Sequence, residues 1–375
     1  MAGRLAIVGA GVIGLSCGWR AAEAGWSVRL IDPAPGSGSS WVAGGMLAPV
    51  TEAWPGEEEV LALGAESLVG WPSFAGELGR AAGRPAGLRT EGTVVVAAAA
   101  GDRAELDELA GYLSTLGRSV DRLSARELRR LEPAIGPDVR GGLSVPGDLA
   151  VDNRALLTAL RVAGERAGTR VVAARAQRVE AGRVELSDGS VLAADAVLIA
   201  AGAHSAQLHP GLAGLVRPVK GEILRLRHRP GALPPPSRTV RAVVDGRPVY
   251  AVPRDDGGLV VGATQYETGF DTEPTVGGVR DLLRDAERVL PGIAEYALAE
   301  VAAGLRPGTP DNLPLLGWLA EGVLVATGHG RNGMLLAPLT AASVTAALAG
   351  EPLSPAVLAA DPRRLGRVGA TDVRG

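Results

Sequence analysis

The sequence contains one cysteine, Cys17, among 375 residues, so an internal disulfide and a cysteine metal cluster are both excluded. It also lacks CxxC, HExxH and GxSxG patterns, and metal-dependent hydrolysis and serine-hydrolase chemistry therefore have no local signature. The histidines are scattered along the chain, and we expect them to be structural or exposed: His204, His209, His228 and His329. We therefore predict no bound metal.

The sequence also lacks a large excess of either positive or negative charge. Lys and Arg together number 38 against 41 Asp and Glu, the net charge is −3, and Lys220 is the only lysine. No basic field is present to attract nucleic acid or an anionic membrane. No apolar run of about eighteen residues is free of Gly or charge, and the N-terminus lacks the basic region of a signal peptide. We expect a cytoplasmic protein without a membrane or nucleic-acid partner, and its oligomeric state, including a homo-oligomer, is left open.

The N-terminal region has the pattern of a dinucleotide-binding unit. An apolar strand, a glycine turn, a helix, a second strand and an acidic residue follow one another in 4–8, Gly9-Ala10-Gly11-Val12-Ile13-Gly14, 15–24, 27–31 and Asp32. Gly9 permits a tight turn, Gly11 lets the backbone approach a pyrophosphate, and Gly14 lets the helix pack against the sheet. The helix N-terminus presents N–H groups to phosphate, and Asp32 is placed to bind an adenosine ribose.

Three later segments are rich in small residues. The loop 33–45 is either a flexible connection or a cofactor-wrapping segment, with Ser39 and Ser40 toward phosphate and Gly44-Gly45-Met46 close to a ring system. The strand 196–200 ends in Ala201-Gly202, and the turn 328–333 opens a helix from residue 334. Each turn indicates a close approach of backbone to a flat or phosphorylated group.

The length favours two domains. Residues 57–82 are predicted to be helical with a break at Pro72, and the strands from 215 to 261 are separated by short turns, which indicates an antiparallel sheet. We expect the first sheet to resume near 140 and 300. The predicted fold class is therefore α/β and α+β: a discontinuous Rossmann-like nucleotide domain (1–84, 140–214 and 301–375) and an antiparallel-sheet substrate domain (85–139 and 215–300), with the site between them.

Five motifs, in this order, resemble the FAD-dependent D-amino-acid oxidase family, most closely its glycine oxidase branch, the ThiO proteins of thiamine biosynthesis: GAGVIGLS, SSWVAGGMLAP, LIAAGAHS, AGLRPGTPDNLPLLG and GHGRNGMLLAP. The similarity covers about residues 4 to 348, and GGMLAP and AGLRPGTPDNLP are much more specific than a glycine turn. The resemblance implies an enzyme with non-covalent FAD that converts glycine, and other small amines or D-amino acids, to an imine, with O2 reduced to H2O2. It also implies a functional link to a thiazole synthase.

The resemblance also implies the site residues. Catalytic and substrate-binding roles fall on Tyr250, Arg306 and Arg331, with Met46 at the substrate. The motifs and turns together place the following residues at the FAD: Gly9, Gly11, Val12, Ile13, Gly14, Asp32, Pro33, Ser39, Ser40, Gly44, Gly45, Met46, Ala176, Ala201, Gly202, His329, Gly330, Arg331, Asn332, Gly333, Met334 and Leu335. Pro248 and Gln265 depart from some relatives, which leaves the amine preference open.

The residue types suit this chemistry. A substrate carboxylate is best held by a planar guanidinium, and Arg306 lies between a strand and Pro307-Gly308; the alternative is a surface arginine near a turn. The Tyr250 hydroxyl is a second donor, unless the ring is a core aromatic. Arg331 adds positive charge near substrate and flavin. No general base is needed if the amine binds neutral, so we expect a rate that rises toward alkaline pH.

Other interpretations remain open. Within the family, the alternatives are a sarcosine or broader D-amino-acid oxidase, or a dehydrogenase that uses another acceptor. Covalent flavin attachment through a C-terminal cysteine is excluded because the chain has no such cysteine. From another class, the alternative is a non-catalytic flavin-binding module, which would not need Tyr250 and Arg306 together.

Overall fold

The computed structural model describes residues 2–118 and 120–366. One half of the molecule, which contains the N-terminal glycine turn, is built on a mostly parallel six-stranded sheet. Every neighbouring pair in this sheet is parallel except β19 with β20. In spatial order the strands are β19 (Leu315–Ala320), β20 (Val323–Thr327), β13 (Ala196–Ile199), β1 (Gly3–Val8), β2 (Trp26–Ile31) and β9 (Arg170–Val172). The strands are short apolar runs, as expected for parallel strands covered on both faces.

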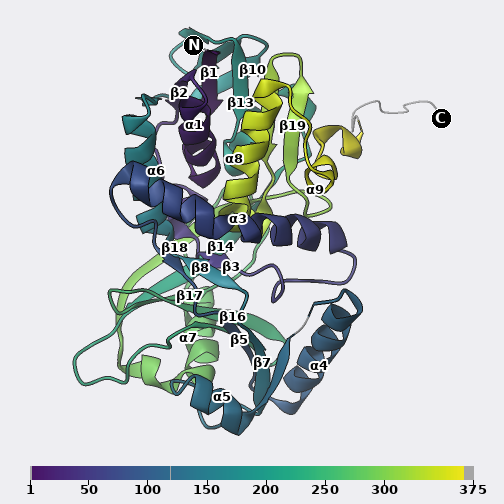
Figure 1. The fold of residues 1–375 in the computed structure, drawn as a ribbon. Helices are drawn as coiled ribbons and strands as arrows, with labels where there is room; N and C mark the ends of the chain where they lie inside the picture. The colour runs from purple at the N-terminus through teal and green to yellow at the C-terminus, as the bar shows by residue number, and fades with distance from the viewer. Residues whose placement is uncertain (1, 119, 367–375) are drawn as a thin grey trace, which may run out of the picture.

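Two different layers cover this sheet. Four helices share one apolar cluster with Leu5 and Ile7: α1 (Val12–Glu23), α3 (Glu58–Ala82), α6 (Asn153–Arg166) and α8 (Gly333–Ala349). Ala6 and Val8 point to the opposite face, where a three-stranded sheet packs on them: β10 (Ala176–Glu180), β11 (Arg183–Leu186) and β12 (Val191–Ala193). Figure 1 shows α1, α6 and α8 side by side, with α3 crossing below them.

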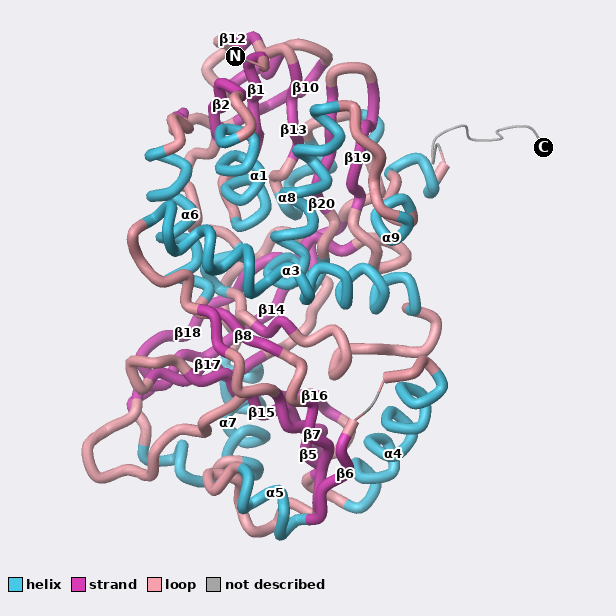
Figure 2. Tube along the Cα trace, viewed as in Figure 1, coloured by secondary structure: helices cyan, strands magenta, loops and turns pink. Residues whose placement is uncertain are grey.

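The second half is built on an eight-stranded sheet, which lies below α3 in Figure 2. Its neighbouring strands are antiparallel apart from the pair β15–β5. In spatial order the strands are β18 (Ala297–Gly308), β14 (Arg217–Arg227), β17 (Gly258–Gly262), β16 (Arg247–Pro253), β15 (Thr239–Val244), β5 (Thr93–Ala97), β7 (Gly141–Val145) and β6 (Asp121–Ser124).

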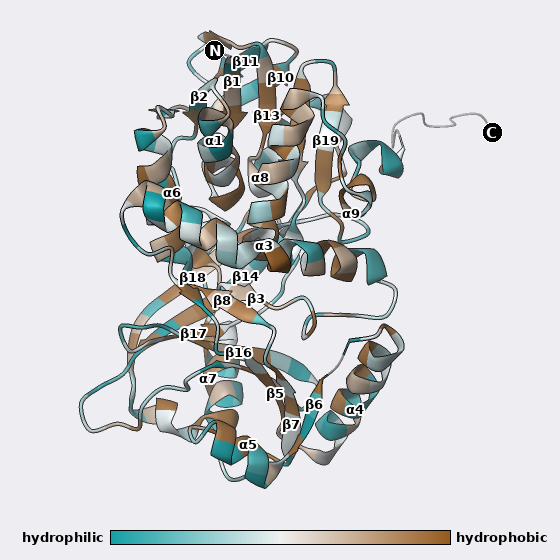
Figure 3. Ribbon diagram, in the orientation of Figure 1, coloured by the Kyte–Doolittle hydropathy of each residue, from teal (hydrophilic) through white to brown (hydrophobic). Residues whose placement is uncertain are grey.

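One face of this sheet is covered by α5 (Ala125–Leu131) and α7 (Val276–Val289), and α4 (Ala100–Thr115) covers the far end of the other face. Figure 3 shows apolar strands between these more hydrophilic helices. The remaining elements are α2 (Ser39–Val42), β3 (Met46–Leu47), β4 (Leu88–Arg89), β8 (Leu149–Val151), α9 (Pro355–Leu358) and the 3-10 helices η1 (Gly202–Gln207), η2 (Pro210–Leu212), η3 (Pro291–Glu295), η4 (Gly330–Asn332) and η5 (Pro362–Leu365). Strands β3, β8 and β4 form a small sheet at the junction of the two halves.

Two strands lie in a different sheet from the one expected. Strand β7 pairs with β5 and β6, and β18 pairs with β14 along its whole length, from Arg227↔Ala297 to Arg217↔Gly308. The prediction that the parallel sheet resumes near 140 and 300 is therefore wrong at these strands, and the expected boundary at 300/301 cuts through β18. An apolar run predicts a strand but does not identify its partner, because pairing is decided by contacts distant in sequence. Residues 367–375 of the expected nucleotide domain lie outside the described part.

Helix α3 is continuous, contrary to the predicted break at Pro72. The side chains of Trp71 and Phe74 are buried and meet edge to face at 5.6 Å. Ser67 Oγ and Trp71 Nε1 both donate to the Leu335 carbonyl oxygen, at 2.6 and 2.9 Å. These tertiary contacts hold the helix on both sides of the proline and override its local preference.

Among the described residues, one helical segment, Gly330–Ala349, is long and apolar enough to cross a membrane by length and composition alone. In this fold 61% of its apolar window is buried, and α8 packs against α1 and α3. A core helix has the same apolar composition, so the segment is weak evidence for a membrane span.

Candidate functional site

The first glycine turn fits closely between neighbouring backbones. Gly9 has φ +104°, and a Cβ there would lie 2.3 Å from the Ala200 carbonyl oxygen. A Cβ on Gly14 would lie 1.9 Å from the Gly9 carbonyl oxygen. Only glycine fits at both positions, so the turn can run along β13 while α1 packs directly on β1. This geometry is that of a backbone cradle for a dinucleotide.

Asp32 braces this turn. Its carboxylate accepts hydrogen bonds from the Ala10 and Ala34 amides, at 2.7 and 2.8 Å. Pro33 is exposed beside it. A carboxylate can accept about four hydrogen bonds, so capacity for a ribose hydroxyl remains. The Val12 amide donates to Ser40 Oγ at 3.0 Å, which ties the N-terminus of α1 to the loop 33–45.

The predicted turns converge at one edge of the parallel sheet. Strands β1, β2, β13 and β20 all run in the same direction, so Asp32, Ala201-Gly202 and the turn 328–333 follow their carboxyl ends. Thr327 Oγ1 donates to the Gly202 carbonyl oxygen at 3.1 Å and links two of these turns. Ala176 packs on the apolar cluster that contains Val8 and Ile31. Ligands of open parallel sheets bind beyond this carboxyl edge.

The turn 328–333 continues into α8, and its side chains other than Arg331 face the core. His329 is 2% exposed, its Nε2 lies 3.0 Å from Thr340 Oγ1, and burial lowers its pKa to about 3, so the ring is neutral. Asn332, Met334 and Leu335 are also buried. These residues, with Gly330 and Gly333, can therefore face a cofactor chiefly through their backbone amides at the α8 N-terminus.

Tyr250 lies in a narrow slot. It pairs with Gly262 across β16 and β17, and a Cβ on Gly262 would lie 2.4 Å from the phenol oxygen. A Cβ on Gly44 would lie 2.8 Å from the same oxygen. Burial raises the pKa of Tyr250, and its hydroxyl makes no hydrogen bond to another described residue. The phenol therefore remains a protonated donor for a ligand.

Arg306 lies near Tyr250 with a free guanidinium. Its side chain crosses Gly221 of β14, where a Cβ would lie 2.2 Å from Nη1. Its only hydrogen bond within the described residues goes to the Thr264 carbonyl oxygen, at 3.2 Å, and no described carboxylate pairs with it. A partly buried arginine without an acidic partner is expected where an anion binds.

The strand register places both side chains on one face. Tyr250, Gly262, Ile223 and Ala302 are aligned across β16, β17, β14 and β18, and Arg306 lies an even number of residues from Ala302. Helix α2 approaches this same face, because a Cβ on Gly304 would lie 3.1 Å from Val42 Cβ. The face therefore looks toward the segment of residues 39–46.

The end of this segment is fixed by the junction sheet. Met46 is partly buried and pairs with Ala150. Gly45 has φ +82°, and its carbonyl oxygen accepts from the Val151 amide at 2.7 Å. Gly44, Gly45 and Met46 thus lie between the turns of the parallel sheet and the face that carries Tyr250.

Arg331, which is expected to add positive charge near substrate and flavin, has acidic partners in the structure. Its Nη2 donates to Glu57 Oε2 at 2.6 Å and to the Glu52 carbonyl oxygen at 3.1 Å. The Glu52 carboxylate lies 3.7 Å from Arg331 Nε and 2.7 Å from Arg241 Nη1, and Arg241 pairs with Tyr250 across β15 and β16. Two carboxylates therefore neutralise Arg331, which joins the residues 52–57 to the turn 328–333.

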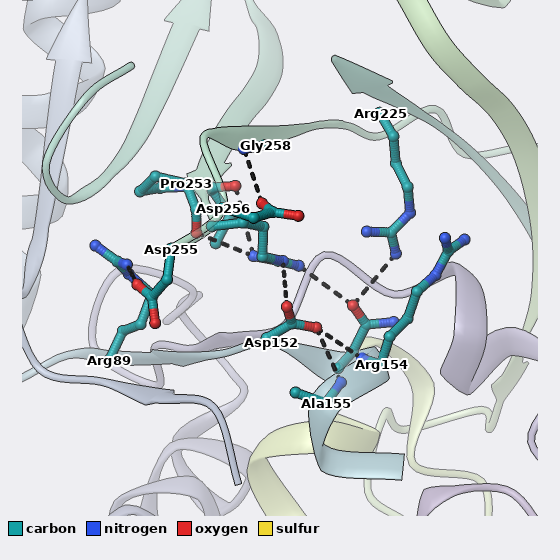
Figure 4. Close-up of polar contacts among 12 residues, drawn as sticks. Arg89, Asp152, Arg154, Ala155, Arg225, Pro253, Asp255, Asp256 and Gly258 are labelled. Carbon is teal, nitrogen blue, oxygen red and sulfur yellow. Dashed lines mark hydrogen bonds and ion pairs between the residues drawn. The ribbon is translucent and has the colours of Figure 1, made fainter. Parts of the chain in front are cut away.

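Sequence reasoning missed a buried polar cluster around Asn153, Arg225 and Arg254, whose surroundings are shown in Figure 4. Its hydrogen bonds join residues more than seventy positions apart, such as Arg225 and Asn153, so no local pattern predicts it. The described residues contain no group of three or more His, Cys, Asp or Glu side chains that could hold a metal ion.

The chain resembles known proteins in both sequence and fold. The family model described as FAD dependent oxidoreductase matches residues 4–347. The glycine oxidase of Geobacillus kaustophilus is 34% identical over 348 residues, 90% of each chain, and a crystal structure of glycine oxidase from this organism superposes with a TM-score of 0.87 at 31% identity, over 96% of this chain and 99% of that one. The bifunctional protein ThiO/ThiG of Synechocystis sp. is 37% identical over 64% of this chain, which spans only 37% of that protein.

Proposed function

The chain belongs to the FAD-dependent oxidoreductase family, and on this premise we propose that it is a glycine oxidase that deaminates glycine, and other small amines or D-amino acids, with production of H2O2. One observation carries the choice of substrate. Among the described residues, the Tyr250 hydroxyl has no hydrogen-bond partner and the Arg306 guanidinium has no carboxylate partner, and the two share one face beside the Gly44–Met46 backbone. Two converging donors in a slot lined by glycines suit a small carboxylate.

The residues present fit FAD. Gly9 and Gly14 let the turn and α1 pack tightly against their neighbouring backbones, the N-termini of α1 and α8 open near the carboxyl edge of the sheet, and Asp32 has remaining acceptor capacity. Binding is non-covalent in this proposal, and attachment through a cysteine is not available because the only cysteine, Cys17, is buried and its burial raises the thiol pKa. When bound, the flavin supplies the two-electron oxidation of the amine and passes the electrons to O2.

The chain's own residues bind and orient the substrate. Arg306 holds the carboxylate, Tyr250 donates a second hydrogen bond, and the two contacts fix the Cα relative to the backbone of residues 44–46. The positive charge of Arg306 lowers the pKa of the substrate ammonium and favours the neutral amine. His329, the histidine predicted at the cofactor, is neutral and its Nε2 lies 3.0 Å from Thr340 Oγ1, so no protein base is assigned.

We further propose roles for the two halves and for a partner. The half built on the parallel sheet binds FAD, and the eight-stranded sheet binds the substrate. A link to a thiazole synthase in thiamine biosynthesis is supported by the name of the bifunctional ThiO/ThiG relative, in which a ThiO unit is joined to ThiG. Arg331 serves this site by holding the residues 52–57 through Glu52 and Glu57.

Anaerobic addition of glycine to the purified protein tests the proposal. We expect a yellow protein whose flavin absorbance bleaches with glycine and returns with O2, releasing H2O2 and glyoxylate. Sarcosine, D-alanine and D-proline, compared under the same conditions, define the amine preference. Bleaching without reoxidation by O2 would indicate a dehydrogenase, a yellow protein that no amine bleaches would indicate a binding module, and a colourless protein that FAD cannot reconstitute would contradict the proposal.

A further inference from the structure

Asn153, the first residue of α6, is completely buried and holds the loop that precedes Gly44. Its Nδ2 donates to the carbonyl oxygens of Ser40 and Trp41, each at 2.8 Å. Its Oδ1 accepts from Arg225 of β14 and from Arg254, which directly follows β16, each at 3.2 Å. One amide side chain therefore joins both halves of the molecule at the loop.

Arg254 also connects to the same loop, in addition to Arg225 and Arg154, which donate to the Trp41 carbonyl oxygen at 3.1 and 3.4 Å. It is 6% exposed, and its Nη2 donates to the Gly44 carbonyl oxygen at 2.8 Å. Its Nε lies 3.8 Å from Asp152 Oδ2, which belongs to the residue that caps α6. The Gly44 backbone is thus held by Arg254, while a Cβ on Gly44 would meet the Tyr250 ring.

Burying the charged guanidinium groups of Arg225 and Arg254 costs free energy. This cost argues that the two side chains do more than fill space in the core. Burial and the charges of Arg154 and Arg254 lower the pKa of Arg225 to about 10. The compensating carboxylate, Glu300, lies 4.0 Å from Arg225 Nε and bonds more closely to Arg154, at 2.7 Å. Figure 4 shows Arg225 and Arg154 on one side of the cluster and Asp152 on the other. A buried ionic cluster is weak evidence for added stability, and in some proteins such groups specify one conformation.

The loop that these groups hold has contacts with both parts of the site. At one end, Ser40 Oγ accepts from the Val12 amide at the N-terminus of α1. At the other end, Gly44 lies against Tyr250. Residues 40–44 therefore connect the predicted pyrophosphate cradle to the substrate face.

We propose that Asn153 and Arg254 are positioning residues that fix the backbone of residues 40–44, so that the FAD-facing loop is ordered before the cofactor binds and Tyr250 keeps its place beside it. The inference rests on the proposed function for its substrate part and on the family alone for its FAD part. When such a loop is released, only the fraction of molecules with the loop in place is competent to bind, and the apparent Kd rises by the inverse of that fraction.

The test compares Arg254→Met with Arg89→Met as a matched control. Arg89 lies at the edge of the same cluster in Figure 4, pairs with Asp255 and donates to the Ser237 carbonyl oxygen at 2.9 Å, and makes no hydrogen bond to residues 40–44. Apoprotein is titrated with FAD by flavin fluorescence, and thermal unfolding of the apoprotein is followed in parallel. We expect Arg254→Met to weaken FAD binding by about tenfold to a hundredfold, the value of one lost charge-assisted hydrogen bond, and Arg89→Met to change it by less than about twofold.

Two further variants keep the test decisive if Arg254→Met does not fold. Asn153→Asp retains an acceptor for both arginines but loses the donors to Ser40 and Trp41, and we expect weakened FAD binding with apoprotein unfolding near that of the wild type. Arg254→Lys retains a single donor, and we expect an affinity between those of the Met variant and the wild type. FAD affinities of all variants within about twofold of the wild type, or loss of affinity only in step with apoprotein stability, would overturn the proposal.

The proposed effect on the position of Tyr250 is measured separately, by the kinetics of glycine oxidation. In variants saturated with FAD, we expect a higher KM for glycine because Tyr250 loses its neighbour, with Arg89→Met unchanged. If wild-type protein binds FAD but oxidises no amine, the proposed function fails while the affinity comparison still decides the role of Asn153 and Arg254.

Discussion

Tyr250 and Arg306 lie on one face of the eight-stranded sheet, and each occupies space that a neighbouring strand leaves by having glycine, at Gly262 and Gly221. A Cβ would come within 2.4 Å of the phenol oxygen at the first position and 2.2 Å of the guanidinium at the second. The two donors therefore lie flat against the sheet, on the face that looks toward residues 39–46.

Substitution can separate two contributions of Arg306 to substrate binding, its positive charge and its planar pair of N–H donors. Arg306→Lys keeps the positive charge but offers a point donor in place of a planar pair, and we expect KM for glycine to rise about tenfold; Arg306→Ala should raise it by about a hundredfold or more. Both variants should remain yellow. Steady-state kinetics and the flavin spectrum measure this, with Arg217→Lys as the control, because Arg217 is half exposed and pairs with Glu267. An unchanged KM would remove Arg306 from the carboxylate site.

Gly221→Ala tests the same geometry without touching either donor. The new methyl would displace the Arg306 guanidinium, so we expect KM for glycine to rise at least about tenfold while bound flavin is retained. Gly111→Ala in α4 is the control, because a Cβ there meets nothing within 4 Å. Equal kinetics in the two variants would show that the Arg306 position is not critical.

The pH dependence follows from which group titrates. A substrate ammonium is mostly charged at neutral pH, so kcat/KM should rise, by at most about tenfold per pH unit, toward mildly alkaline pH. Burial raises the pKa of Tyr250 above its ordinary value, so the phenol stays protonated over this range and no falling limb is expected from it. Tyr250→Phe should keep the shape of the profile with a lower kcat/KM. A flat wild-type profile would contradict binding of the neutral amine.

The sequence predicted the parts of the site that depend on local pattern. The Gly9 and Gly14 turn, with Asp32 after the next strand, is a short motif whose geometry follows from steric limits on the backbone, and the structure shows the predicted fit. Family resemblance and side-chain chemistry both indicate Tyr250 and Arg306, and the strand register brings them to one face. Their roles stay predictions until the variants are measured.

What the sequence did not predict depends on contacts distant along the chain. Arg254 and Gly44 are 210 positions apart, and Asn153 and Trp41 are 112 positions apart, so no periodicity indicates them. The predicted sheet for β7 and the predicted break of α3 at Pro72 were wrong for the same reason. Tertiary pairing and packing decided both.

A buried carboxyl near the site gives a stability prediction. Asp148 is completely buried, its Oδ2 accepts from Thr51 Oγ1 at 2.8 Å, and its Oδ1 has no partner among the described residues. Burial raises its pKa to about 7, with Arg241 opposing the shift. The folded state therefore holds this proton more tightly than the unfolded chain, whose carboxyl titrates near its ordinary value of about 4.

The sign of the effect follows from this difference. Between about pH 4 and pH 7 the folded state binds the additional proton, so the free energy of unfolding falls as pH rises through this window and is level above it. Asp148→Asn removes the penalty while keeping an acceptor for Thr51, so the variant apoprotein should equal the wild type near pH 4 and exceed it at pH 8 by on the order of 2–4 kcal/mol. Urea unfolding at several pH values measures the difference, and Asp138→Asn, at an exposed position, should show none. A pH-independent difference for Asp148→Asn would mean that Arg241 keeps the carboxylate ionised in the folded protein.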